Sequence, residues 1–237
     1  GVLRKINIFC VRSQSQYERF VFLGAPPERV KVSGNMKYCN STEEEKIGDE
    51  REVRKKFAIK DDDLIFTAGS THNGEEEIIV EVFRRLRQDF ANLRLIIAPR
   101  YIERADDIKR LAGELPVTVI DKFGILKELY SISDIVFVGG SLVRHGGHNI
   151  IEPAIFGKPV LFGPHMFNFR DVAEEFLKGG GAVLVRDKND LEITCKRLLT
   201  NKGERWRLGE NARLVVLRNK GAAENCFIEL KQVLGDA

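Results

Sequence analysis

The sequence predicts an α/β protein with a Rossmann-like, doubly wound parallel sheet. Two observations favour this fold class. From about Leu64 onward, short apolar runs alternate with amphipathic helical stretches. Each apolar run is continuous and rich in β-branched residues, as expected for strands that helices cover on both faces. Such an alternation, with right-handed crossovers, builds a doubly wound sheet.

The elements of this sheet follow one another along the chain. The predicted strands are Ile65–Ala68, Leu93–Ala98, Val117–Ile120, Ile135–Val138, Val160–Phe162 and Val183–Val185. The predicted connecting helices are Glu75–Phe90, Glu103–Ala112, Leu126–Ile132, Asn149–Phe156, Arg170–Leu177 and Leu191–Leu199. In the first helix, Ile79, Val82 and Leu86 recur at helical spacing, which gives that helix an apolar face.

The two ends of the chain differ from this core. Residues 1–40 predict a strand, a helix and a second strand, at Ile6–Val11, Gln14–Leu23 and Val30–Ser33. Because the sequence starts at Gly1 rather than at a Met, we interpret residues 1–40 as a remnant of a preceding domain with its linker. Residues 41–237 form the second predicted domain. It ends in two helices, Glu204–Arg218 and Ala222–Leu234.

The composition argues against several classes of protein. A net charge of +3 is too small to indicate nucleic-acid binding. No apolar run approaches the roughly 20 residues of a membrane-spanning helix. The cysteines form no Cys-x-x-Cys pair, which argues against a compact zinc site and fits reduced thiols in a cytosolic protein.

Distinctive residues follow the predicted strands. In open α/β sheets, ligands bind beyond the carboxyl ends of the strands. The runs at these positions are Gly69–His72, Pro99-Arg100, Asp121–Gly124, Gly139–Ser141, Gly146–Asn149 and Gly163–His165. One edge of the sheet therefore gathers glycines, hydroxyls, an arginine and several histidines, and this clustering predicts a ligand site.

The chemistry of this edge fits a nucleotide. Backbone N–H groups at glycine-rich helix starts favour an anion, Ser70 and Thr71 offer hydroxyl donors, and Arg100 offers a charge-assisted contact to phosphate. Glu152 is placed to accept hydrogen bonds from a ribose diol. The same residues also fit a purely structural interpretation, because glycines end strands, hydroxyls cap helices and arginines lie on surfaces.

Other motifs are missing. Gly157-Lys158 is followed by Pro159, so no phosphate-binding P-loop is present, and no G-x-G-x-x-G follows a strand. His145 and His148 lack a third ligand at a recognisable spacing, and we therefore predict neither a metal nor a cofactor.

Several motifs resemble one known family. The runs Val138–Val143, Gly146–Ala154 and Gly157–Phe169 are similar to bacterial 3-deoxy-D-manno-octulosonic acid (Kdo) transferases. The shorter motifs are Ala68–His72, Ala98–Arg100, Leu23–Ala25 and Gly34–Lys37, and with them the resemblance spans nearly the whole chain. It implies the GT-B fold, in which two Rossmann-like domains face each other, and it makes residues 41–237 the carboxy-terminal, nucleotide-sugar-binding domain. It also implies transfer of Kdo from CMP-Kdo to a lipid A precursor at the cytoplasmic face of the bacterial inner membrane.

The resemblance implies a role for each site residue. The CMP phosphate is expected to bind Ser70, Thr71, Arg100, Gly147, His148 and Asn149, although His148 has the alternative role of orienting the loop. Glu152 is expected to bind the ribose, and the loop 121–126, with Phe123 and Gly124, to pack near the cytosine. Phe123 is bulkier than the family pattern predicts. The catalytic base is expected in the preceding domain, so no catalytic residue is assigned to this chain.

Two alternatives compete with this hypothesis. One is another GT-B enzyme that uses a UDP-sugar, such as a 2-epimerase, and a preference for UDP over CMP would favour it. The other is a non-catalytic nucleotide-binding module.

Overall fold

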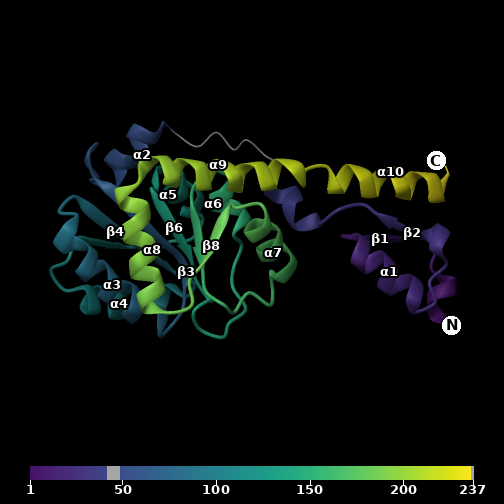
Figure 1. Ribbon diagram of the computed structural model, residues 1–237, viewed down its shortest axis with the longest axis horizontal. Coiled ribbons are helices and arrows are strands. Elements are labelled where there is room, and N and C mark those ends of the chain that lie inside the picture. The colour runs from purple at the N-terminus through teal and green to yellow at the C-terminus, as the bar shows by residue number, and fades with distance from the viewer. Residues whose placement is uncertain (42–48, 236–237) are drawn as a thin grey trace. The chain divides into compact units, whose positions relative to one another are not determined.

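A computed structural model describes residues 1–41 and 49–235 (Figure 1). The chain forms two compact units, one made of Glu45–Val215 and the other of Gly1–Glu44 with Val216–Ala237. Within the described residues, no helix combines the length and apolar character that crossing a membrane requires.

The larger unit contains a parallel sheet with the strand order β5-β4-β3-β6-β7-β8. Its strands are β3 (Leu64–Thr71), β4 (Leu93–Pro99), β5 (Val117–Val119), β6 (Ile135–Val138), β7 (Val160–Phe162) and β8 (Ala182–Leu184). Each coincides with a predicted strand to within a few residues. The predicted doubly wound α/β fold is thereby confirmed.

Helices cover both faces of this sheet (Figure 1). They are α2 (Glu50–Lys56), α3 (Glu75–Asp89), η4 (Ile102–Arg104), α4 (Ala105–Ala112), α5 (Leu126–Ile132), α6 (Ile151–Ile155), α7 (Arg170–Lys178), α8 (Lys188–Thr200) and α9 (Lys202–Arg218), the last of which extends beyond the unit. One face packs against α3, α4 and α8, and the opposite face packs against α2 and α5. Because the inner strands are covered on both sides, the side chains of β6 and β7 are buried and those of β3 and β4 nearly all so, which explains their unbroken apolar runs, whereas the edge strands β5 and β8 are partly exposed.

One helix of this unit was not among the predicted elements. Helix α2 has only one buried residue, Val53, in a charge-rich segment, so its apolar period is too weak to read from the sequence. It is held by its cap, because the Asp49 carboxylate accepts a hydrogen bond from the Arg51 backbone N–H.

The smaller unit contains a two-stranded parallel sheet in which Phe9 pairs with Val30. Its elements are η1 (Val2–Lys5), β1 (Phe9–Val11), α1 (Gln14–Phe22), η2 (Pro27–Arg29), β2 (Val30–Val32), η3 (Met36–Ser41) and α10 (Ala222–Leu234). Helix α10 belongs here because Asn225 donates to the Ser33 carbonyl. The sequence division after residue 40 had grouped α10 with the larger domain. The structure instead groups it with the amino-terminal residues, through contacts far apart in the sequence.

Candidate functional site

The site lies where the strand order of the sheet reverses. Strand β3 lies between β4 and β6. The chain continues from β3 to β4 and β5 in one direction across the sheet and from β6 to β7 and β8 in the other, so the loops after β3 and β6 diverge. Ligands of doubly wound sheets bind in the crevice that such diverging loops open. The end of β3 carries Ser70, the loop after it carries His72, and the loop after β6 consists of the segment 139–149.

Ser70 and Thr71 occupy a distorted end of β3. Ser70 has a φ of 56°, which is uncommon for a residue with a side chain, and the pairing of β3 with β4 shifts register at this point. The Thr71 hydroxyl is buried and donates to Glu76 (3.2 Å), while the Thr71 carbonyl accepts from the Arg100 N–H (2.9 Å). Ser70 therefore faces the site, whereas Thr71 holds the loops after β3 and β4 together.

A pocket of about 140 Å³ opens beside Ser70. It joins Ser70 to Arg100, Phe123 and Gly124, four of the residues predicted from the sequence. The Phe123 side chain is 69% exposed. Lys122 also lines the pocket and had not been chosen as a site residue, although it lies in the predicted run after β5. Three separate loops thus converge on one small, positively charged pocket.

The buried carboxylate of Glu75 fastens two loops of the site. It accepts hydrogen bonds from four backbone N–H groups, those of His72 (3.0 Å), Gly140 (2.7 Å), Ser141 (2.9 Å) and Leu142 (2.9 Å). Burial raises the pKa of the Glu75 carboxyl, and the four donors act in the opposite direction. Glu75 was not predicted as a site residue, although the sequence contains a signal for its role. Two acidic residues at the start of a helix, next to a glycine-rich loop, are suited to bind free N–H groups.

Glu76 fastens the third loop. It is fully buried and pairs with Arg104 (Nη2 to Oε2, 2.9 Å) in addition to the hydroxyl of Thr71. The hydrogen bond to Glu76 raises the pKa of Arg104. The segment after β4 is therefore tied to the start of α3 by the Arg104–Glu76 side-chain contact and to the end of β3 by the Arg100–Thr71 backbone contact.

Three histidines gather between these loops. His72 is buried, and its Nε2 lies 2.8 Å from Nε2 of the half-buried His148. The ring of His145 stacks on that of His72, with centroids 4.1 Å apart. The described residues include no cluster of three side chains with the geometry to hold a metal ion. The sequence singled out His145 and His148, but His72 brings them together from another loop.

The loop before α6 places the remaining predicted residues. Gly147 has a φ of 72°, a backbone conformation that residues with a side chain rarely adopt, and a Cβ there would meet the Met166 side chain. The Asn149 amide donates to Glu152 (3.1 Å), and its oxygen accepts from the Ile151 N–H (3.1 Å). Helix α6 begins at Ile151, two residues later than predicted, and has only five residues. A helix this short has a weak dipole. It therefore attracts an anion less strongly than the longer helix predicted from the sequence would.

A larger cavity of about 420 Å³ lies on the β7 side of the same loop. Its wall comes from the loop 163–167, from α7 and from the ends of β7 and β8, and Arg144, His165, Arg170 and Glu174 add charge or polarity. None of the residues expected to bind the nucleotide lines this cavity, but the run Gly163–His165 after β7 does.

Comparisons with known proteins agree with this geometry. A family model described as "Glycosyl transferases group 1" matches residues 49–215. The chain is 37% identical to the 3-deoxy-D-manno-octulosonic acid transferase of Haemophilus influenzae, over 97% of this chain and 58% of that protein. It is 33% identical to the Aquifex aeolicus transferase of the same name, over 85% of this chain and 56% of that protein. The chain thus spans little more than half the length of these relatives, and the resemblance to Kdo transferases is confirmed.

Solved structures show the same fold. The C-terminal CMP-Kdo binding domain of WaaA from Acinetobacter baumannii aligns with a TM-score of 0.66 and 26% identity, over 70% of this chain and 95% of that domain. The S. aureus MnaA-UDP co-structure aligns with a TM-score of 0.67 over 96% of this chain and 61% of that one. Its identity of 16% shows likeness of fold alone.

Proposed function

We propose that this chain, which belongs to the group 1 glycosyl transferases, binds the nucleotide of CMP-Kdo for transfer of Kdo to a lipid A precursor. The observation that carries the proposal is the convergence of Ser70, Arg100, Phe123 and Gly124 on one pocket at the carboxyl ends of the strands. The relatives named as Kdo transferases support the transfer of Kdo. The acceptor, a lipid A precursor, and the location at the cytoplasmic face of the bacterial inner membrane are proposed from the family resemblance of the sequence.

The phosphate is assigned to the side of the pocket that carries Arg100. The Arg100 side chain is exposed, and it forms no ion pair with any described residue. The Ser70 hydroxyl lines the same pocket, and the half-buried His148 lies close enough for the charge of Arg100 to lower its pKa. A guanidinium without a carboxylate partner, next to neutral donors, suits a phosphate.

The nucleoside is assigned to the groups on either side. Glu152 is half-buried and oriented by Asn149, which suits acceptance of hydrogen bonds from a ribose. The exposed ring of Phe123 offers a surface for the cytosine, and Gly124 turns the loop with a φ of 85°. Thr71 contributes through the Glu76 contact rather than through a free hydroxyl. Gly147 and Asn149 contribute by shaping the loop that carries His148.

The chemistry required of these residues is stabilisation of the leaving group. When the bond between Kdo and the phosphate oxygen breaks, its electron pair goes to CMP, whose phosphate gains negative charge. Arg100 and the neighbouring donors are placed to stabilise that charge. The proposal assigns no general base to the described residues. The carboxylates of Glu75, Glu76 and Glu152 already accept hydrogen bonds.

Titration calorimetry with CMP, UMP and AMP tests the proposal. We expect CMP to bind most tightly, and Arg100→Ala to weaken CMP much more than cytidine because it removes a phosphate partner. Arg84→Ala is the matched control, since Arg84 is an exposed arginine on α3 away from the pocket. Equal or absent heats for the three nucleotides would contradict the CMP assignment, and tighter binding of UMP would favour a UDP-sugar enzyme.

A further inference from the structure

Two of the histidines in the site share a proton. The Nε2 atoms of His72 and His148 are 2.8 Å apart, and the two rings are nearly parallel, at 7°. Two ring nitrogens form a hydrogen bond only if one of them carries a hydrogen and the other does not. The pair is therefore compatible with a neutral state and with a state that holds one additional proton on an outer nitrogen. A second additional proton would place two N–H groups against each other.

The surrounding backbone holds this pair in place. Gly140 has a φ of 67°, and a Cβ there would lie 3.0 Å from His148 Cδ2 and 3.3 Å from His72 Cδ2. The N–H groups of both His72 and Gly140 donate to the buried Glu75. The imidazoles thus rest against a glycine loop whose position Glu75 fixes. Such a pair can change its charge without a large rearrangement.

The charges that face the pair are mainly positive. Arg100 follows β4, Arg104 lies in η4, and His145 stacks on His72 from the loop after β6. The ring of Tyr101 meets His72 edge-on. The acidic groups nearby, Glu75 and Glu76, are already bound to backbone N–H groups and to Arg104. Without a ligand, this arrangement disfavours an additional positive charge on either histidine.

We propose that the His72–His148 pair takes up one proton when a nucleotide phosphate binds beside Arg100, so that nucleotide binding is coupled to protonation. The half-buried His148 is assigned the contact to the phosphate, whereas the buried His72 is assigned a positioning role through the shared hydrogen bond. The inference rests on the proposed nucleotide function. It adds a second positive charge to the phosphate site that is present only when the anion is bound.

The pKa values of the free protein agree with this geometry. Burial lowers the pKa of His72 to about 4, and His145, His148, Arg100 and Arg104 act in the same direction. Burial also lowers the pKa of His148, followed by the charges of Arg100 and His145. Both imidazoles are thus neutral near pH 7. A bound phosphate offsets the positive charges and raises the pKa of the pair. The affinity for phosphate-bearing ligands should then rise as the pH falls, by up to about tenfold per pH unit for one proton.

Histidine NMR of the full chain tests the proposal directly. The chain has four histidines, so ¹³C labelling of their Cε1 atoms gives a simple spectrum. The probe is the methyl ester of CMP, because a phosphodiester has no titration of its own near neutral pH. We expect the saturating ester to raise the pKa of the pair by about one unit or more. Cytidine, which lacks the phosphate, should leave the pKa of the pair unchanged.

Variants distinguish proton uptake by the His72–His148 pair from a general effect of charge on ester affinity. The double variant His72→Gln/His148→Gln retains a hydrogen-bonding group at both positions but cannot take up a proton, and it should flatten the pH dependence of ester affinity. His165→Gln is the matched control, because the His165 side chain lines the larger cavity and lies outside the pair. It should keep the wild-type pH dependence.

Three results would overturn the inference. If the ester binds and the pKa values of His72 and His148 do not move, the pair is not coupled to the phosphate, although the proposed function stands. If cytidine raises the pKa values as much as the ester does, burial by the nucleoside is the cause and the phosphate is not. If neither CMP nor its ester binds, the proposed function itself fails, and the inference fails with it.

Discussion

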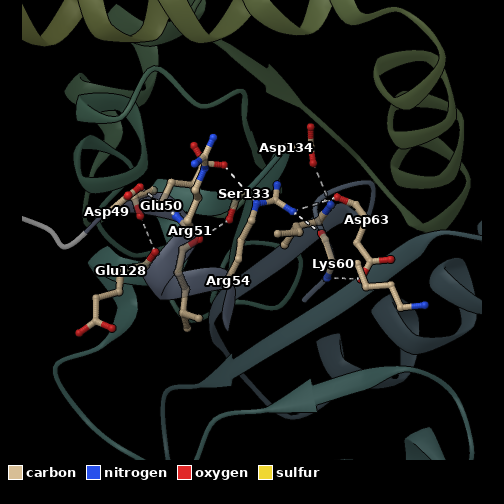
Figure 2. A network of polar contacts seen from close by, with 12 residues as sticks. Asp49, Glu50, Arg51, Arg54, Lys60, Asp63, Glu128, Ser133 and Asp134 are labelled. Carbon is tan, nitrogen blue, oxygen red and sulfur yellow. Dashed lines mark hydrogen bonds and ion pairs between the residues drawn. The ribbon is translucent and has the colours of Figure 1, made fainter. Parts of the chain in front are cut away.

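The two ends of the parallel sheet use their charged residues differently. Figure 2 shows the network before β3 and β6, where charged groups bind each other and the backbone. The Arg54 guanidinium donates to the carbonyl of Lys60 (2.9 Å), and Asp134 accepts from the Ile65 N–H (2.9 Å) while pairing with Arg205 (3.2 Å). These contacts close the amino end of the sheet, and they leave its charges already neutralised.

The carboxyl end divides into two layers. The inner layer, Glu75 and Glu76, is buried and fully engaged, much like the network at the amino end. The outer layer, Arg100, Lys122 and Phe123, is exposed and lines a pocket. Polar residues at the amino end thus stabilise the fold, whereas at the carboxyl end a stabilising layer supports a layer that is available to a ligand.

The largest expected effect comes from breaking the inner layer. Glu75→Gln replaces an acceptor of four N–H groups by an amide that can no longer satisfy all of them, at a cost of about 3 kcal/mol in the free energy of unfolding. Urea denaturation measures this change. Glu77→Gln is the matched control, because Glu77 caps the same helix from an exposed position by accepting only from the Gly74 N–H (3.0 Å). It should cost less than about 1 kcal/mol. Equal losses in the two variants would contradict the special role of Glu75.

A second effect appears at low pH. The folded state holds His72 with a pKa of about 4, below its ordinary value of 6.5, mainly because it is buried. The unfolded chain therefore binds more protons between these values, and stability falls as the pH drops from 6.5 to 4. We expect this loss to be on the order of 2 kcal/mol. Comparing wild type with His72→Gln at each pH isolates the contribution of His72, and parallel stability curves would contradict it.

How much could be predicted from the sequence also differs between the two layers. The strands were predictable because each is a continuous apolar run, and the pocket residues Ser70, Arg100, Phe123 and Gly124 were predictable because they directly follow those strands. The inner layer was not predicted. Glu75 and Glu76 resemble an ordinary acidic first turn until the fold brings the N–H groups of residues 140–142 beside them. Short-range pattern thus locates the residues that line the pocket, and long-range contact determines what supports them.

A pair of arginine variants tests the comparison of the two ends. Arg54→Ala removes a guanidinium that binds two carbonyls at the amino end, so we expect a loss of about 1–2 kcal/mol in unfolding free energy and no change in CMP affinity. Arg100→Ala should show the reverse, with stability within about 0.5 kcal/mol of wild type and CMP affinity reduced by about 1.5 kcal/mol. Denaturation and calorimetry on the same preparations measure both quantities. If Arg100→Ala destabilises the fold as much as Arg54→Ala does, Arg100 is structural.

The smallest expected effect concerns the edge of the pocket. Phe123→Ala removes a ring that is 69% exposed, so the fold loses little buried area and its stability should stay within about 0.5 kcal/mol of wild type. If the ring packs on the nucleobase, CMP affinity should fall about threefold. UMP affinity should fall equally, because an aromatic ring stacks on any base. Trp206→Ala is the matched control, since Trp206 is 68% exposed on α9 and does not line the pocket. A loss confined to CMP would show instead that the loop of Phe123 distinguishes cytosine from uracil, and unchanged affinity for both nucleotides would place the base away from this loop.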